Sequence, residues 1–163
     1  MIYIVMGVSG TGKTTVGRLL AQQLQLPFYD ADDFHSAANV EKMRQGTPLT
    51  DADRHDWLAA LATGLSTWAQ DGGAVLACSA LKESYRTTLQ AAVPEPIAWV
   101  VLEGDKELIA SRLRTRPGHY MGERMLDSQL ATLESPAYGL HLSISAPPEE
   151  LVAQAVAHLR PLE

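Results

Sequence analysis

The chain has 163 residues, of which 46% are hydrophobic, and a formal net charge of −6, values typical of one globular domain. The acidic balance argues against a nucleic-acid partner, which needs a basic surface, and no apolar run reaches the roughly 18 residues that a membrane span requires. A strand starts at the first residues, so we expect no signal peptide, and the single cysteine, Cys78, excludes an internal disulfide and fits a cytoplasmic protein.

Strand-like and helix-like segments alternate along the whole chain, which predicts an α/β fold: a five-stranded parallel sheet flanked by helices, in one domain covering 1–163. The expected strands cover 2–6, 27–30, 74–78, 97–102 and 140–145. The expected helices cover 13–24, 36–45, 51–70, 80–91, 106–114, 121–133 and 148–159.

The helix expected at 51–70 has the clearest start, because Thr50 and Asp53 have the spacing of a capping box. Its apolar positions fall on one face and predict core packing: Trp57, Leu58, Leu61, Leu65 and Trp68. We expect Cys78 to be a buried small hydrophobic residue rather than a nucleophile.

A glycine-rich run between the first strand and the first helix carries the strongest functional signal. It matches the pattern G-x-x-x-x-G-K-[ST] and predicts a phosphate-binding loop, since its glycines let backbone N–H groups point at phosphate oxygens at a helix N-terminus. Lys13 would contact the β- and γ-phosphates and Thr14 would bind Mg²⁺. The chain is therefore expected to bind ATP through Gly7, Val8, Ser9, Gly10, Thr11, Gly12, Lys13, Thr14 and Thr15.

An acidic turn follows the second strand, with carboxylates at Asp30, Asp32 and Asp33 and a histidine at His35. Ligands of open parallel sheets bind at the carboxyl ends of the strands, so the turn is expected beside the γ-phosphate. One carboxylate could accept the proton of an attacking hydroxyl while another supports Mg²⁺. The alternative is a solvated turn that caps the next helix.

The third strand ends in a Cys-Ser-Ala-Leu-Lys run instead of the aspartate found there in many nucleotide hydrolases. The Asn-Lys-x-Asp motif that recognises guanine is absent as well. Both absences argue against a GTPase that acts as a molecular switch. Ser79 could reach Mg²⁺ through water or cap the next helix, and the sequence does not decide between these. Lys82, Tyr85 and Arg86 share one helical face, which favours an anionic substrate pocket over a solvated face.

A basic segment from Arg112 to Arg124 is interrupted by Pro117-Gly118. Such a hinged, positively charged segment is typical of a lid that closes over phosphates, and it predicts a small lid at about 112–124. An exposed basic loop is the alternative.

Taken together, these motifs resemble those of bacterial gluconokinases of the phosphate-loop type, relatives of shikimate and adenylate kinases. The similarity covers nearly the whole chain and is most specific in the run 78–82 followed by Tyr85 and Arg86. It also rests on 7–14, 30–35, 39–43, 46–49, 51–57, 102–105 and Arg116 with Gly118-His119. Tyr120 departs from the family pattern, which often has Phe after the Gly-His pair.

The resemblance implies a P-loop kinase fold and ATP-dependent phosphorylation of D-gluconate at its 6-hydroxyl, with Mg²⁺, and it allows a homodimer. Asp32 is then the candidate base or hydroxyl orienter, and Asp30 supports the metal through water together with Thr14. Arg112 and Arg116 are expected at the ATP phosphates, and Lys13, Asp32 and Arg116 are the expected catalytic residues. The expected substrate-binding residues lie partly in a helical region at about 31–70: Asp32, His35, Arg54, Lys82, Arg86 and His119.

Two rival hypotheses remain open on the sequence alone. One is a different small-molecule kinase of the same fold, acting on shikimate or another sugar acid. The other is a non-catalytic regulator that binds a nucleotide, against which the intact Lys13, Asp32 and lid arginines argue.

Overall fold

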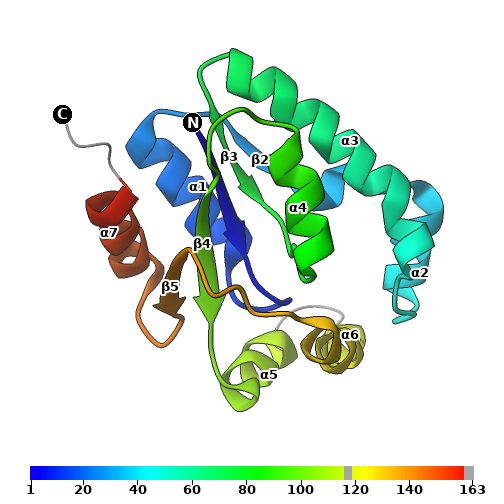
Figure 1. The fold of residues 1–163 in the computed structure, drawn as a ribbon. Helices are drawn as coiled ribbons and strands as arrows, with labels where there is room; N and C mark the ends of the chain where they lie inside the picture. Colours follow the sequence, from blue (N-terminus) through cyan, green and yellow to red (C-terminus); the bar gives the residue numbers. More distant parts are fainter. Residues whose placement is uncertain (116–118, 160–163) are drawn as a thin grey trace.

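A parallel sheet of five strands forms the centre of the molecule, in the order β2-β3-β1-β4-β5 (Figure 1). The computed structural model describes residues 1–115 and 119–159, and for 119–124 the backbone alone. The strands are β1 (Ile2–Met6), β2 (Phe28–Asp30), β3 (Ala74–Ala77), β4 (Ala98–Glu103) and β5 (Leu140–Ser143). The predicted fold class is confirmed.

Helices cover both faces of the sheet, and their bounds agree with the expected ones to within two residues except at α4. They are α1 (Lys13–Leu24), α2 (Ala37–Arg44), α3 (Asp51–Gln70), α4 (Glu83–Ala91), α5 (Lys106–Arg114), α6 (His119–Thr132) and α7 (Pro148–Leu159). A short 3-10 helix, η1 (Ala31–Phe34), occupies the acidic turn after β2. Among the described residues, no helix has the length and apolar character needed to cross a membrane.

Alternation along the strands divides the buried side chains into two cores, one on each face of the sheet. Tyr3 and Val5 of β1 pack with α1, α5, α6 and α7, whereas Ile2, Ile4 and Met6 pack with α3 and α4. The expected apolar face of α3 lies in this second core, and the capping box at Thr50 is formed as predicted. Figure 1 shows α3 and α4 on one side of the sheet and α1 and α7 on the other.

The helix α4 begins at Glu83, three residues later than expected. Ala80 has a φ of 45° and Lys82 is extended at the N-cap position, so 80–82 turn away from β3 before the helix starts. Ser79 therefore does not cap α4, which removes one of its two predicted roles. Cys78 is buried at the end of β3, as predicted.

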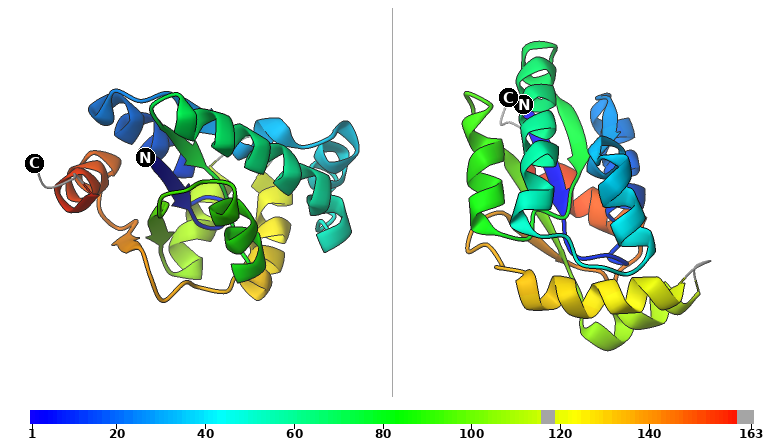
Figure 2. Two further views of the ribbon diagram at one scale, coloured as in Figure 1. Left: turned by 45° about the horizontal axis from the view of Figure 1, so that its top comes forward. Right: turned by 90° about the vertical axis from the view of Figure 1, so that its right-hand side faces the viewer.

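The parallel register brings three strand ends together at one edge. Val5 of β1 and Asp30 of β2 both align with Ala77 of β3, so the phosphate loop, the acidic turn and the segment after β3 are neighbours. Below this edge lie α5 and α6, as the right-hand view of Figure 2 shows. This edge is where an open parallel sheet binds its ligands.

Candidate active site

The loop between β1 and α1 takes a conformation that only glycine accepts easily at its two ends. Gly7 has a φ of 153°, and a Cβ there would lie 2.8 Å from Thr11 Oγ1 and 2.9 Å from the Leu102 carbonyl oxygen. Gly12, with a φ of 92°, is the N-cap of α1. The loop therefore curls back over the start of α1, where first-turn N–H groups lack intrahelical acceptors and the helix dipole favours an anion.

The interior of the loop is held together by the Val8 carbonyl oxygen. It accepts hydrogen bonds from Thr11 Oγ1 at 2.8 Å and from Lys13 Nζ at 3.2 Å. The Thr11 side chain is buried, so this hydroxyl shapes the loop. The ammonium group of Lys13 lies at the loop itself, beside the position that its motif predicts for a phosphate.

A side chain from the acidic turn contacts the phosphate loop directly. Thr14 Oγ1 donates to Asp30 Oδ2 at 2.9 Å, and Asp30 Oδ1 accepts from the backbone N–H of Asp32 at 3.0 Å. A hydroxyl and a carboxylate at hydrogen-bond distance fit a hard cation that also binds phosphate oxygens and water. Among the residues that the structure describes, no group of three acidic, histidine or cysteine side chains could hold a metal by itself.

Asp32 lies at the same edge, with its charge close to that of Lys13. Surrounding protein atoms desolvate its carboxylate and raise its pKa above the usual 3.8, and the neighbouring Asp30 and Asp33 act in the same direction. The positive charge of Lys13 opposes this rise. A carboxyl group with a raised pKa beside a phosphate site is the arrangement expected of a general base.

The acidic turn is anchored to α3 by one tryptophan. Trp57 Nε1 donates to the Ala31 carbonyl oxygen at 2.7 Å, and the His35 ring stacks on the Trp57 ring with centroids 4.5 Å apart. Burial and the nearby positive charge of Arg54 lower the pKa of His35 to about 4. His35 is therefore a neutral hydrogen-bonding group at pH 7.

A second group of charged residues, termed here the substrate-side cluster, joins the start of α3 to the start of α4. It consists of Asp51, Arg54, Lys82 and Tyr85. Lys82 Nζ donates to Asp51 Oδ1 at 2.9 Å, and the Tyr85 hydroxyl donates to Asp51 as well. Arg54 Nη1 donates to the Tyr85 oxygen at 3.1 Å.

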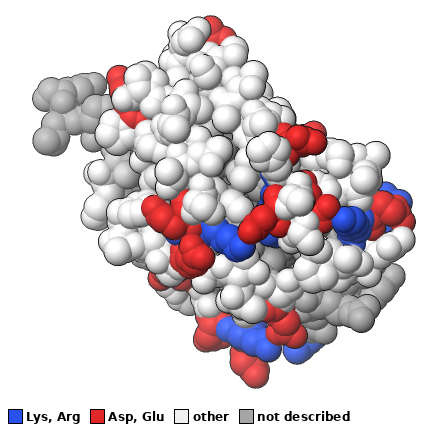
Figure 3. All heavy atoms as spheres, turned by 45° about the vertical axis from the view of Figure 1, so that its right-hand side comes forward, with Lys and Arg blue, Asp and Glu red and all other residues white. Residues whose placement is uncertain are grey.

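Charge counting shows what this cluster can bind. Hydrogen bonds from Tyr85 and Lys82 hold the pKa of Asp51 below its usual value, so one carboxylate faces the two cations Arg54 and Lys82. The surplus of one positive charge matches a substrate with one carboxylate. In Figure 3, basic and acidic side chains lie close together along a band across this face of the molecule.

Arg112 lies beside the loop, as predicted for an ATP-binding residue. A hollow of about 190 Å³ is lined by Arg112 and by residues of the loop, α1 and the segment around the start of α7: Gly10, Thr11, Gly12, Thr15, Val16, Ala146, Pro148 and Leu151. Arg112 Nη2 donates to the Ile144 carbonyl oxygen at 2.6 Å.

Arg86 differs from the other predicted substrate residues in its hydrogen bonds. Its side chain is 1% exposed, and it donates from Nη1 to Ala80 O at 2.6 Å and from Nη2 to Glu134 O at 2.6 Å. Nε donates to the Tyr138 hydroxyl at 2.9 Å. These bonds join the 80–82 turn, α4 and the segment after α6, so we leave Arg86 out of the proposed substrate contacts.

A larger hollow of about 780 Å³ lies between α4, the sheet and α7, and is lined by Arg86, Trp99, Tyr138 and His158 among others. It contains no residue of the phosphate loop or of the substrate-side cluster. It is therefore separate from the candidate active site.

Two predicted site residues cannot be placed. Arg116 lies outside the described residues, and so does the side chain of His119. Their roles, and the lid predicted at 112–124, stay predictions.

Asp51 and Asn39 are the site residues that sequence reasoning gave no role. Asn39 is 5% exposed, and its Nδ2 lies 2.7 Å from the Asp53 carbonyl oxygen and 3.4 Å from His35 Nδ1. Asp51 is the first residue of α3, where an acidic residue is common for reasons of helix stability alone. A signal for Asn39 was available, because it is the chain's only asparagine and lies within the segment of resemblance.

Comparison with known proteins agrees with this geometry. A family model described as shikimate kinase matches residues 9–157. The gluconokinase of Gluconobacter oxydans is 52% identical over 134 residues, covering 82% of this chain and 75% of that protein. The thermoresistant gluconokinase of Escherichia coli is 39% identical over 160 residues, covering 95% of this chain and 91% of that protein.

Solved structures give the same result. A gluconokinase from Sinorhizobium meliloti aligns with a TM-score of 0.86 and 40% identity, covering 95% of this chain and 89% of that one. An APS kinase from Mycobacterium tuberculosis, 19% identical with a TM-score of 0.77, shows a shared fold alone. The strand order, the phosphate loop and these similarities lead to one conclusion: the chain belongs to the gluconokinases, a family of enzymes with the phosphate-loop kinase fold.

Proposed function

We propose that this enzyme transfers the γ-phosphoryl group of ATP to the 6-hydroxyl of D-gluconate, giving 6-phospho-D-gluconate and ADP. The observation that carries the proposal is the placement of one phosphate loop, one carboxylate beside Lys13 and a cluster with one surplus positive charge at the same sheet edge. The gluconokinase relatives supply the identity of the acceptor.

On the nucleotide side, the loop N–H groups and Lys13 would hold the β- and γ-phosphates. The adenine base of ATP would lie near Arg112. Thr14 would bind Mg²⁺ together with phosphate oxygens and water, and Asp30 would support the ion through one of these waters. When bound, this ion would neutralise charge that develops on the phosphoryl oxygens. Arg116, predicted from the resemblance, would add a further positive charge there.

On the acceptor side, the transfer forms a bond between the 6-hydroxyl oxygen and the γ-phosphorus and breaks the bond from that phosphorus to the β–γ bridging oxygen. Asp32 would orient the hydroxyl and accept its proton. Its raised pKa brings its basicity closer to neutrality, which favours proton transfer. Phosphoryl transfer depends mainly on positioning and charge, so orienting the hydroxyl is the larger part of this role.

The gluconate carboxylate would bind Arg54 and Lys82, since charge-assisted hydrogen bonds from two cations suit a carboxylate. Neutral His35 would serve the sugar hydroxyls, with His119 predicted to assist. We infer a cytoplasmic enzyme from its single cysteine, and the family resemblance allows a homodimer.

Two alternatives are a kinase for shikimate or another sugar acid, and a non-catalytic nucleotide-binding regulator. An ADP-release assay over gluconate, shikimate and other sugar acids separates all three, with the product's phosphate position read by NMR. We expect gluconate to give the highest kcat/KM and a phosphate on C6. Faster turnover of another acid would make that acid, and not gluconate, the phosphoryl acceptor. No turnover with any acid would favour the non-catalytic regulator.

A further inference from the structure

A glutamine of α6 makes a two-bond contact with the phosphate loop, across 120 residues of chain. The Ser9 backbone N–H donates to Gln129 Oε1 at 2.7 Å, and Gln129 Nε2 donates to Ser9 Oγ at 3.1 Å. Both side chains are partly buried. In Figures 1 and 2, the loop after β1 lies directly against α6.

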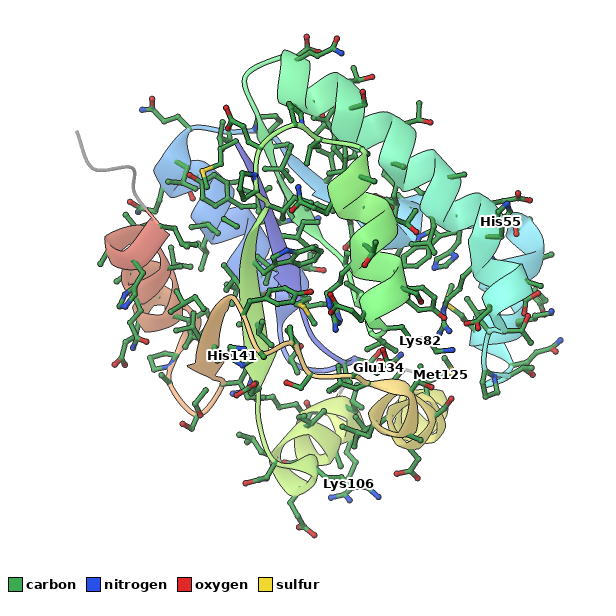
Figure 4. All side chains as sticks on the ribbon, in the orientation of Figure 1. His55, Lys82, Lys106, Met125, Glu134 and His141 are labelled. Atoms are coloured by element: carbon green, nitrogen blue, oxygen red, sulfur yellow. The ribbon has the colours of Figure 1, made fainter. Side chains whose placement is uncertain are left out.

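The helix that carries Gln129 is itself firmly positioned. Leu126 of α6 is 1% exposed within the core beneath α1 and α5. Just after the helix, the Glu134 backbone N–H donates to Leu81 O at 2.7 Å, and Glu134 Oε1 accepts from the Glu83 N–H at 2.9 Å. Figure 4 shows Glu134 and Met125 at this end of the molecule, near Lys82. Gln129 therefore extends from a fixed platform rather than from a loop.

Ser9 lies between Gly7 and Gly10, which both have positive φ values, a backbone conformation that costs glycine little. Its N–H points at Gln129 and so is not one of the first-turn amides that α1 presents to an anion. The Gln129 side chain holds the Ser9 backbone, the part of the loop termed here the Ser9 limb. It leaves the first-turn amides of α1 free to face a phosphate.

We propose that Gln129 is a positioning residue for ATP: it holds the Ser9 limb so that the phosphate loop is already in its binding shape. This inference rests on the proposed kinase function, but it concerns the nucleotide and not the acceptor. Preorganisation lowers the cost of ordering a site when its ligand binds. Loss of Gln129 should therefore weaken ADP and ATP binding and leave gluconate binding almost unchanged.

The test uses Gln129→Met, which keeps the length of the side chain and removes both hydrogen bonds, and Gln129→Ala as a second variant. Gln154→Met is the matched control, because Gln154 is an exposed glutamine of α7. The Kd for ADP is measured by calorimetry, together with the KM for ATP, the KM for gluconate and the melting temperature.

We expect both Gln129 variants to raise the Kd for ADP and the KM for ATP about tenfold, because a looser loop must be ordered when the nucleotide binds. The KM for gluconate should stay within twofold, and Gln154→Met should match the wild type. Unchanged ADP binding would overturn the proposal, and so would equal losses for both substrates or variants that fail to fold, since these indicate a general structural role. ADP binding does not depend on the acceptor, so failure of gluconate turnover in the wild type would count against the proposed function alone.

Discussion

The phosphate loop and the substrate-side cluster meet at one sheet edge but are built in opposite ways. The loop is a local structure of eight consecutive residues, shaped by glycine conformations and by hydrogen bonds to the Val8 carbonyl. The cluster joins side chains that are 31 and 34 residues apart, from the start of α3 and the start of α4 with its N-cap. Backbone geometry makes the nucleotide site, whereas tertiary packing makes the acceptor site.

This difference has a functional consequence. Backbone N–H groups recognise a phosphate whatever it is attached to, so the loop can be shared by many kinases. A cluster of paired side chains changes its charge and shape with each substitution, so it sets the acceptor. Substitutions in the loop should therefore affect ATP and catalysis, and substitutions in the cluster should affect gluconate.

The largest effect is expected for Lys13→Ala. It removes a positive charge aimed at the transferred phosphoryl group, and we expect kcat to fall at least about 10³-fold with the fold intact. Lys106→Ala is the control, because this exposed lysine pairs with Asp127 on the surface at 2.7 Å. Steady-state rates and circular dichroism check both. Activity of Lys13→Ala within tenfold of the wild type would contradict the role of the phosphate loop in phosphoryl transfer.

Asp32→Asn should give the next largest loss, about 10²-fold in kcat with little change in the KM for ATP, since an amide orients a hydroxyl but accepts no proton. Asp33→Asn, at the next carboxylate of the same 3-10 turn, should lose less than threefold. A shift in the Mg²⁺ requirement with an unchanged kcat would instead make Asp32 part of the metal site.

The raised pKa of Asp32 adds a pH dependence to this prediction. The wild-type rate should fall as the pH drops through a value above 3.8, because Asp32 becomes protonated. The pH–rate profile of Asp32→Asn should not show this fall. The folded state binds the Asp32 proton more tightly than the unfolded state, so the ionised carboxylate lowers stability at neutral pH. Asp32→Asn should therefore melt at a higher temperature than the wild type at pH 7.

A smaller and more selective effect is expected for Arg54→Met. The substitution keeps an apolar stem and removes one charged donor from the cluster, so the KM for gluconate should rise about 10- to 100-fold while the KM for ATP stays within twofold. Arg44→Met, at an exposed arginine paired with Glu41, is the control. Equal changes for both substrates would mean that the two sites are not separable.

The smallest effect concerns stability. The pKa of His35 is lowered to about 4 in the folded protein, so as the pH falls the unfolded chain takes up the His35 proton before the folded protein does. The contribution of neutral His35 to folding stability is therefore complete above about pH 6.5 and is lost as the pH falls towards 4. His35→Gln should flatten the fall in melting temperature between pH 7 and 4.5 by about 2–4 °C, after allowance for partial exposure. His55→Gln, at an exposed position of α3, is the control, and an unchanged slope in His35→Gln would mean that the His35 pKa is not lowered in the folded protein.

Sequence patterns predicted the parts of this molecule that depend on local rules. The phosphate loop, the capping box at Thr50 and the bounds of α1, α3, α5 and α7 follow from spacing, caps and breakers. The start of α4 did not, because Ala80 has a positive φ and its carbonyl oxygen accepts from Arg86 instead of joining the helix. Helical spacing placed Arg86 beside Lys82 and Tyr85, but it could not show that the Arg86 guanidinium is bonded to carbonyl groups from Ala80 and Glu134.

The same limit applies to Asp51 and Gln129. Each is an ordinary helical residue in sequence, and each acquires its role from a partner more than 30 residues away. Such pairs become visible only when the sheet order and the helix positions are known. The sequence therefore indicates the reaction, whereas the structure indicates which acceptor contacts can exist.

The central claim is that the substrate-side cluster recognises a carboxylate. The most direct measurement compares kcat/KM for gluconate with that for D-glucitol, which has a primary hydroxyl but no carboxylate, in the wild type and in Arg54→Met. We predict that the wild type prefers gluconate at least about 100-fold and that Arg54→Met loses most of this preference. Equal use of both substrates by the wild type, or an unchanged preference in Arg54→Met, would contradict the account.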